Sequence, residues 1–217
     1  MTATNSVWDN RSSQYRESNA HNSGPDLDLM VELCEGNSNI SVLDVATGGG
    51  HVANGLRKTG CTVTTTDASA AMSPDIVCDA TLLPFNNRLF NVVTCRYATH
   101  HFSDITAALA EMERVSKDKV VIVDTLYQNE DLEKAERIRD SDHVRNYSEQ
   151  EWQTMLQQAS LQIDSCTVMD KWMNLDEWLT RTACTGTNAE TVRQLVEPQT
   201  CGTEWNLPVI AIRGRIH

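Results

Sequence analysis

The segment from Ile40 to Ala53, ISVLDVATGGGHVA, constrains the fold of this chain more than any other stretch of it. Its first half is an apolar, β-branched run of the kind that forms a parallel strand covered on both faces. An acidic residue, Asp44, stands near the end of that strand, and three consecutive glycines, Gly48 to Gly50, follow it. Glycine lets a ligand approach the backbone without hindrance from a Cβ atom. Because ligands of open α/β sheets bind beyond the carboxyl ends of strands, the segment predicts a strand, turn and helix that cradle a nucleotide.

Two classes of nucleotide cofactor use a turn of this kind. Gly48, Gly50 and Ala53 satisfy the dinucleotide spacing, and Asp67 lies about 20 residues further on, where that fingerprint places a ribose-binding acid. Asp44 argues against a dinucleotide, because a carboxylate at the tip of the strand would repel a pyrophosphate. The same charge suits a ligand that carries an amino group and a sulfonium.

The stretch Asp44 to Gly50, DVATGGG, resembles the first motif of the class I S-adenosylmethionine-dependent methyltransferases, D-x-[GA]-x-G-x-G. The resemblance continues in order along the chain. The run VTTTD ends at Asp67, where this family binds the ribose hydroxyls, and Asp79-Ala80 resembles the third motif, whose acid accepts a hydrogen bond from adenine. The runs 90–96 and 97–102 resemble the fourth strand and the segment that leads from it over the cofactor. Within the superfamily, the likeness is to the ubiquinone/menaquinone-biosynthesis type and its small-molecule relatives.

This resemblance implies a Rossmann-like, doubly wound α/β fold with a mostly parallel seven-stranded sheet and an antiparallel last strand. It implies one methyltransferase domain over residues 1–217, with residues 1–25 as an amino-terminal segment or lid, although a docking helix built on Tyr15 and Trp8 fits the same pattern. The cofactor-binding residues that it implies are Asp44, Ala46, Thr47, Gly48, Gly50, Asp67, Ala68, Asp79, Ala80, Arg96 and Tyr15. Without the resemblance, Arg96 reads as a surface ion-pair partner.

Methyl transfer from a sulfonium asks mainly for in-line alignment and exclusion of water, and a base is needed only when the acceptor carries a proton. His100 and His101 follow the fourth strand at the cofactor end and are the candidate catalytic bases. Helix capping or pocket lining is the structural alternative for both. Asp124 is expected at the pocket mouth or as the cap of the next turn. Further expectations place His143, Arg145 and Tyr147 on the acceptor side and Trp172, Met173 and Trp178 in the core.

The pattern of apolar residues alternates between strands and helices, as a doubly wound sheet requires. Helices are expected at 26–35, 51–58, 105–115, 130–139, 149–159, 175–179 and 190–196, and later strands at 119–124, 163–168 and 209–214. The crossover between Asp67 and Asp79 is unusually short, because a parallel connection normally needs a dozen or more residues. We therefore expect a helix of one or two turns that ends at Pro74 and a stub of edge strand at 76–78. That side of the sheet would be exposed, or buried by a second subunit in a homodimer.

The amino-acid composition limits the classes of substrate that the protein is expected to bind. The chain has 217 residues, 30 acids against 18 bases and a net charge of −12, with no Lys/Arg cluster, which excludes a nucleic-acid substrate. A small neutral or cationic acceptor is the expectation. No apolar run spans a bilayer and no secretory signal begins the chain, so the protein is expected in the cytoplasm. The seven cysteines are scattered, which predicts free thiols, and no cluster of metal-ligand residues suggests a metal.

Two other function classes remain open. A nicotinamide-dependent reductase is disfavoured by Asp44 and by the absence of a Tyr-x-x-x-Lys pair. A domain that binds S-adenosylmethionine or S-adenosylhomocysteine without transferring methyl, as a cyclase or a partner subunit, is kept open by the short crossover. The acceptor itself is not readable from the sequence.

Overall fold

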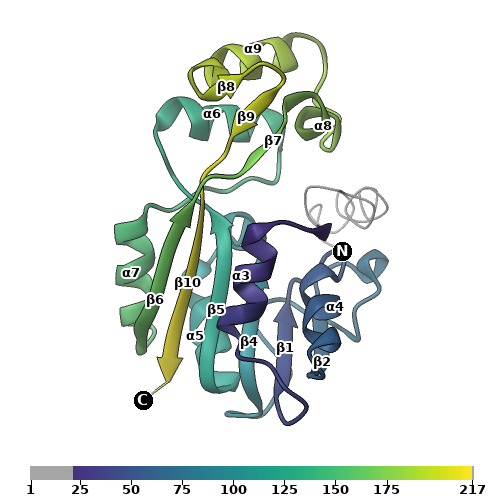
Figure 1. Cartoon of the computed structure of the whole chain (residues 1–217), viewed down its shortest axis with the longest axis vertical. Helices are drawn as coiled ribbons and strands as arrows, with labels where there is room; N and C mark the ends of the chain where they lie inside the picture. The colour runs from purple at the N-terminus through teal and green to yellow at the C-terminus, as the bar shows by residue number, and fades with distance from the viewer. Residues whose placement is uncertain (1–21, 217) are drawn as a thin grey trace.

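The central feature of the computed structural model, which describes residues 22–216, is a seven-stranded sheet of order β3-β2-β1-β4-β5-β10-β6 (Figure 1). Its strands are β1 (Ser41–Val45), β2 (Thr62–Asp67), β3 (Ile76–Val77), β4 (Phe90–Arg96), β5 (Ser116–Thr125), β6 (Leu161–Met169) and β10 (Val209–Ile216). All pairs among β1 to β5 are parallel, whereas β10 runs antiparallel to both β5 and β6. The expected sheet with its antiparallel last strand is confirmed.

Helices cover both faces of this sheet. The helices are α3 (Pro25–Leu33) and α4 (His51–Lys58) on one face and α5 (Ile105–Val115) and α7 (Glu149–Gln158) on the other (Figure 1). Successive side chains of β5 alternate between the two resulting cores: Val121 and Val123 face α3 and α4, and Val120 and Ile122 face α5 and α7. Burial on both faces explains why these strands are continuous apolar runs.

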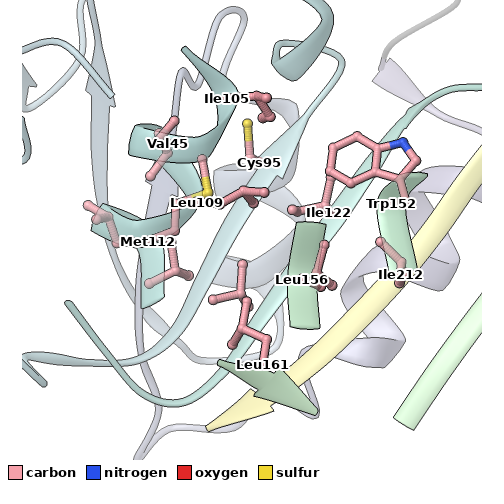
Figure 2. Close-up of a cluster of buried hydrophobic side chains, with 14 of the residues drawn as sticks. Val45, Cys95, Ile105, Leu109, Met112, Ile122, Trp152, Leu156, Leu161 and Ile212 are labelled. Carbon is pink, nitrogen blue, oxygen red and sulfur yellow. The ribbon is translucent and has the colours of Figure 1, made fainter. Parts of the chain in front are cut away.

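The core beneath α5 and α7 is dense with large side chains (Figure 2). Trp152 and Leu156 of α7 and Leu109 of α5 lie over Ile122 and Ile212 of the sheet. Burying an aliphatic side chain of this size contributes about 1.5–3 kcal/mol relative to leaving it in water. This core therefore holds α5 and α7 against β4, β5 and β10.

The crossover between β2 and β3 is as short as predicted. It holds a single turn of 3-10 helix, η1 (Ala70–Met72), and β3 is a two-residue strand at the sheet edge. Asp75 extends the edge just before β3 begins: its Oδ2 accepts from Thr65 N at 2.8 Å and from Thr65 Oγ1 at 2.9 Å. Val77 is 54% exposed and Leu82 76% exposed, so this side of the described structure is thinly covered, as expected.

A small cap stands above the carboxyl ends of the strands (Figure 1). It consists of α6 (Glu130–Arg139), α8 (Leu175–Thr180), α9 (Gly186–Val196), the 3-10 turn η3 (Glu197–Gln199), and a second sheet of β7 (Trp172–Asn174), β9 (Glu204–Asn206) and β8 (Thr200–Cys201). The cap has its own apolar cluster, centred on Trp178 and Trp205. The sequence predicted its helices but not its strands, and the expected burial of Trp172 is wrong: this side chain is 52% exposed on β7.

Most predicted helix limits agree with the structure within one or two residues, and α9 begins at Gly186, four residues before the expected start. The proposed amino-terminal lid, including Tyr15, lies outside the described residues except for its last four positions. Between residues 22 and 216, no helix has the length and apolar character needed to span a membrane.

Replacing Asp75 with alanine should lower the free energy of unfolding by about 1–3 kcal/mol, because the buried Thr65 N–H loses its acceptor. Asp75→Asn keeps an acceptor oxygen at the same place and should cost less than half as much. Urea unfolding of the three proteins checks the order. Equal stability of wild type and Asp75→Ala would show that this side chain does not complete the sheet edge.

Candidate functional site

The turn after β1 has an unusual backbone. Ala46, Gly48 and Gly50 have φ angles of 52°, 52° and 75°, all in the left-handed region that favours glycine. A Cβ atom added to Gly48 would meet nothing within 4 Å, so this backbone faces open space. Gly50 then serves as the N-cap of α4. The turn thus presents backbone without side chains at the start of a helix, where a ligand can approach closely.

Asp44 lies buried beneath this turn, at 1% exposure. Its carboxylate accepts from Thr47 Oγ1 at 2.6 Å and from Thr94 Oγ1 on β4 at 2.9 Å. Burial raises the pKa of Asp44 to about 6, although these two hydroxyls and the Ala53 backbone N–H oppose the shift. The side chain therefore holds a negative charge at neutral pH at a cost in stability.

Asp67, at the end of β2, is joined to the same turn. Its Oδ2 accepts from Gly48 N and its Oδ1 from Ser69 N, both at 2.9 Å. Burial raises the pKa of Asp67, against the effect of these backbone donors. The two acids at the tips of neighbouring strands therefore flank the glycine turn.

A cavity of about 550 Å³ opens over these groups. Ten of the residues expected to bind cofactor or to catalyse line it, namely Asp44, Ala46, Thr47, Gly48, Asp67, Ala68, Asp79, Ala80, Arg96 and His101. Gly50 and His100 do not line this cavity, and Tyr15 lies outside the described residues. Asp79 sits at the open side, where its Oδ1 accepts from Thr81 N and Oγ1 at 2.8 Å.

Arg96 lines the cavity, but its guanidinium is held by a buried acid. Asp26, at the start of α3, accepts from Arg96 Nε at 3.0 Å, from Tyr97 Oη at 2.9 Å and from Lys171 Nζ at 2.8 Å. Burial opposes the ionised form, yet the two cations lower the pKa of Asp26. This acid thus ties α3, the end of β4 and the base of the cap together beside the cavity, and Arg96 is a buried ion-pair partner here.

The two adjacent histidines have different environments. Both lie in the 3-10 helix η2 (Thr99–His101). His100 Nδ1 donates to the carboxylate of Asp124. The same carboxylate accepts from Thr99 Oγ1, and from Thr125 N at 2.7 Å. Burial disfavours the imidazolium, but Asp124 outweighs it and raises the pKa of His100. Asp124 therefore orients this imidazole and also caps the turn.

His101 donates from Nδ1 to the Asp142 carbonyl oxygen at 3.0 Å, which places the lone pair of the neutral ring on Nε2. Burial and the neighbouring His100 lower the pKa of His101. The lowered pKa keeps this ring neutral but makes it a weaker base, so it is the position of His101 at the wall of the large cavity, where His100 is absent, that favours it for general-base chemistry there.

Sequence reasoning missed part of the cavity wall. Residues 141–144, which follow α6, line the cavity, and Met72 and Phe102 line it as well. Of the acceptor-side expectations, His143 is in this wall, whereas Tyr147 packs in the core and Arg145 pairs with Glu151. The sequence feature that pointed to this part of the wall was the run 139–148, which resembles the family. The run does not indicate which of its side chains point into the cavity. Within residues 22–216, no group of three His, Cys, Asp or Glu side chains is arranged to hold a metal ion.

The strand order, the glycine turn and the acids that end neighbouring strands are those of a class I S-adenosylmethionine-dependent methyltransferase. A family model described as a methyltransferase domain matches residues 16–165, more than half of the chain. The chain therefore belongs to the methyltransferase domain family.

Several known proteins are similar to this chain. The uncharacterized methyltransferase YcgJ of Bacillus subtilis is 29% identical over 205 residues, covering 84% of this chain and 79% of that protein. Its crystal structure superposes with a TM-score of 0.77 at 25% identity and covers 88% of this chain and 98% of its own. The ubiquinone/menaquinone biosynthesis C-methyltransferase UbiE of Burkholderia vietnamiensis is 39% identical over 66 residues, which are 30% of this chain and 27% of that protein.

A further solved structure shares the fold. The geranyl diphosphate C-methyltransferase of Streptomyces coelicolor A3(2), in complex with S-adenosyl-L-homocysteine, has a TM-score of 0.64 at 15% identity, over 88% of this chain and 75% of that one. Together these comparisons confirm the resemblance to the class I methyltransferases that the sequence indicated.

Asp44→Asn should stabilise the cofactor-free protein at pH 7.5 by on the order of 2 kcal/mol. The folded-state pKa of about 6 lies above the unfolded value, so the proton-linked stability of wild type is present at low pH and is lost as pH rises through 6. The difference in unfolding free energy between Asp44→Asn and wild type should therefore vanish near pH 4. Denaturant unfolding between pH 4 and 8 measures it.

The exposed Asp28→Asn removes the same charge from the first turn of α3 and should change stability by less than about 0.5 kcal/mol at any pH. A pH-independent effect of Asp44→Asn would contradict a buried, strained carboxylate at position 44.

Proposed function

We propose that this protein binds S-adenosylmethionine in the large cavity and transfers its methyl group to a small molecule. The observation that carries the proposal is the cavity itself, which Asp44, Asp67 and Asp79 line together with the open backbone of Gly48. These groups suit the cofactor: carboxylates beside open backbone complement an amino group, a sulfonium and ribose hydroxyls. The bound cofactor supplies an activated methyl electrophile.

Each residue has a separable role in this proposal. Asp44 and the turn hold the amino-acid end of the cofactor, Asp67 the ribose and Asp79 the adenine. The wall formed by residues 141–144 excludes water from the methyl group, and His101 Nε2 takes the proton of an acceptor that carries one. Asp124 and His100 form a rigid support beside His101, with ring centroids of the two histidines 4.0 Å apart.

The short crossover does not weaken this proposal. The residues on either side of it, Asp67, Ala68, Asp79 and Ala80, all reach the cavity wall, so the loss of a helix leaves the cofactor surface in place. The short crossover therefore gives no reason to prefer a non-methylating role, and the assay of methyl transfer below distinguishes the two classes. The excess of acids over bases in the whole chain supports a small acceptor over a nucleic acid.

Gly48→Ala should weaken binding of S-adenosylhomocysteine at least tenfold, because a methyl group would occupy the space in which the cofactor approaches the backbone. Gly186→Ala in the cap is a matched control, with a φ of 60° and nothing within 4 Å of the added Cβ. Both variants should lose about 1 kcal/mol of stability from the left-handed backbone. Calorimetric titration with S-adenosylhomocysteine, and with NADH as the competing class, measures the affinities.

If the two glycine variants bound S-adenosylhomocysteine equally well, the glycine turn would not be the cofactor site. Binding of NADH and not of S-adenosylhomocysteine would contradict the proposed function and would indicate a nicotinamide-dependent reductase.

His101→Ala should lower the rate of methyl transfer by about 10²–10⁴-fold, the usual contribution of a general base, with S-adenosylhomocysteine affinity within twofold of wild type. The assay incubates the protein with methyl-labelled S-adenosylmethionine and an extract of its own host, followed by mass-spectrometric identification of the labelled product. A variant rate equal to that of wild type would limit His101 to lining the cavity. Absence of any labelled product would favour the non-methylating class.

A further inference from the structure

One short segment of the chain is hydrogen-bonded to the histidine pair of η2. This wall segment, residues 141–146, follows α6, and its first four residues line the large cavity. The carbonyl oxygen of Asp142 accepts from His101 Nδ1 at 3.0 Å. The carbonyl oxygen of His100 accepts in turn from Val144 N at 2.9 Å. The place of the wall segment therefore sets where the Asp142 carbonyl oxygen lies relative to the His101 ring.

A buried carboxylate holds the wall segment against α6. Glu133, in the first turn of this helix, has a side chain that is 3% exposed. Its Oε1 accepts from His143 Nε2 at 3.0 Å, and both of its oxygens accept from Asn146 N at 3.2 Å. One side chain thus binds the wall segment on both sides of Val144, the residue that contacts the His100 carbonyl oxygen.

Glu133 is ionised at neutral pH. Burial opposes its charge, but the donors around it, His143, the Asn146 N–H and Arg137, outweigh this effect and lower its pKa. An ionised carboxylate only accepts hydrogen bonds, so His143 carries a proton on Nε2. Hydrogen bonds to a charged acceptor are about twice as strong as neutral ones, so a glutamine at position 133 would hold the wall segment more weakly.

The Asp142 carbonyl oxygen decides which nitrogen of His101 carries the proton. Burial and the neighbouring His100 lower the pKa of His101, so its ring is neutral and holds one N–H and one lone pair. The hydrogen bond at one ring nitrogen fixes the role of the other. A carbonyl oxygen only accepts, so it keeps the proton on Nδ1 and the lone pair on Nε2. Without this contact the ring could take the opposite tautomer, which has no lone pair on Nε2.

The ring of His100 is held separately. Its Nδ1 donates to Asp124, and it lines a second cavity of about 40 Å³ that lies between the cap and the sheet. Glu133 lines neither cavity. A change at Glu133 therefore reaches the large cavity through the wall segment, and the His100 ring is an internal reference for any measurement on His101.

We propose that Glu133 is a positioning residue for methyl transfer, because it holds the wall segment so that the Asp142 carbonyl oxygen keeps the lone pair of His101 on Nε2. The inference rests on the proposed function, in which His101 Nε2 takes the proton of the methyl acceptor. The contribution of Glu133 is geometric, and a displacement of about 1 Å at a reacting group can cost roughly 10²-fold in rate.

The first measurement uses the wild-type full chain, labelled with ¹⁵N in its histidines, at pH 7.5. Long-range ¹H–¹⁵N correlation spectra report which nitrogen of each neutral ring carries the proton, and His101→Ala assigns the His101 signals. We expect the Nδ1–H tautomer at His101, although an imidazole free in water prefers the Nε2–H form. The Nε2–H form at His101 of the wild type would overturn the inference.

Glu133→Gln should populate the Nε2–H tautomer at His101 and leave the His100 signals unchanged. It should also lower the rate of methyl transfer by about 10–10²-fold, with S-adenosylhomocysteine affinity within twofold of wild type. Glu133→Asp keeps the charge and should recover part of both losses. The rate is measured with methyl-labelled S-adenosylmethionine and host extract, as for His101→Ala.

Glu136→Gln is the matched control. Glu136 lies on the same helix, its side chain is 4% exposed, and it accepts from Arg139 Nη2 at 3.0 Å and not from the wall segment. This variant also removes a buried carboxylate from α6, so it reproduces the effect of that loss alone. It should keep the wild-type tautomer at His101 and the wild-type rate.

A folded Glu133→Gln protein with the wild-type tautomer at His101 would overturn the inference, as would an equal change in Glu136→Gln. If Glu133→Gln did not fold, His143→Leu breaks the same hydrogen bond from the wall segment, and an unchanged tautomer there would also overturn it. In each of these outcomes, labelled product from the wild type leaves the proposed function standing. Absence of labelled product would remove the proposed function, while the tautomer would still decide whether Glu133 positions His101.

Discussion

The buried carboxylate of Asp44 is the constraint on which the rest of the site depends. A charge in the interior is tolerated only with hydrogen-bond donors around it, and these come from Thr47 in the turn, Thr94 on β4 and the Ala53 N–H of α4. The same contacts fix the turn between β1 and α4 and join it to the neighbouring strand. Burial of this charge raises the pKa of Asp44 and therefore lowers the stability of the fold at neutral pH.

Much of the sheet was predictable because its information is local. The apolar run ending in Asp44 and the glycines after it specify strand, turn and helix together, and the number of residues between Asp67 and Asp79 alone excluded a full helix. The cap strands are two or three residues long and show no periodicity, so nothing in the sequence marks them. The contacts of Asp26 join residues 70 and 145 positions apart, a separation at which no pattern in a single chain is informative.

The histidine pair shows why candidate residues identified from sequence need geometry. Adjacent side chains on a 3-10 helix project about 120° apart, so His100 and His101 face different cavities and meet different partners. One is tied to a carboxylate and the other to a carbonyl oxygen, and their pKa values move in opposite directions. Position along the chain made them equivalent, whereas their surroundings give one a supporting role and the other the lone pair beside the large cavity.

The separate apolar cluster of the cap has an evolutionary consequence. Its side chains, such as Trp205 and Val192, pack against one another and not into the two cores of the main sheet. Substitutions there can accumulate without loosening the strands that hold Asp44 and Asp67. Related chains can in this way keep the glycine turn and its flanking acids unchanged while the sequence of the cap above them diverges.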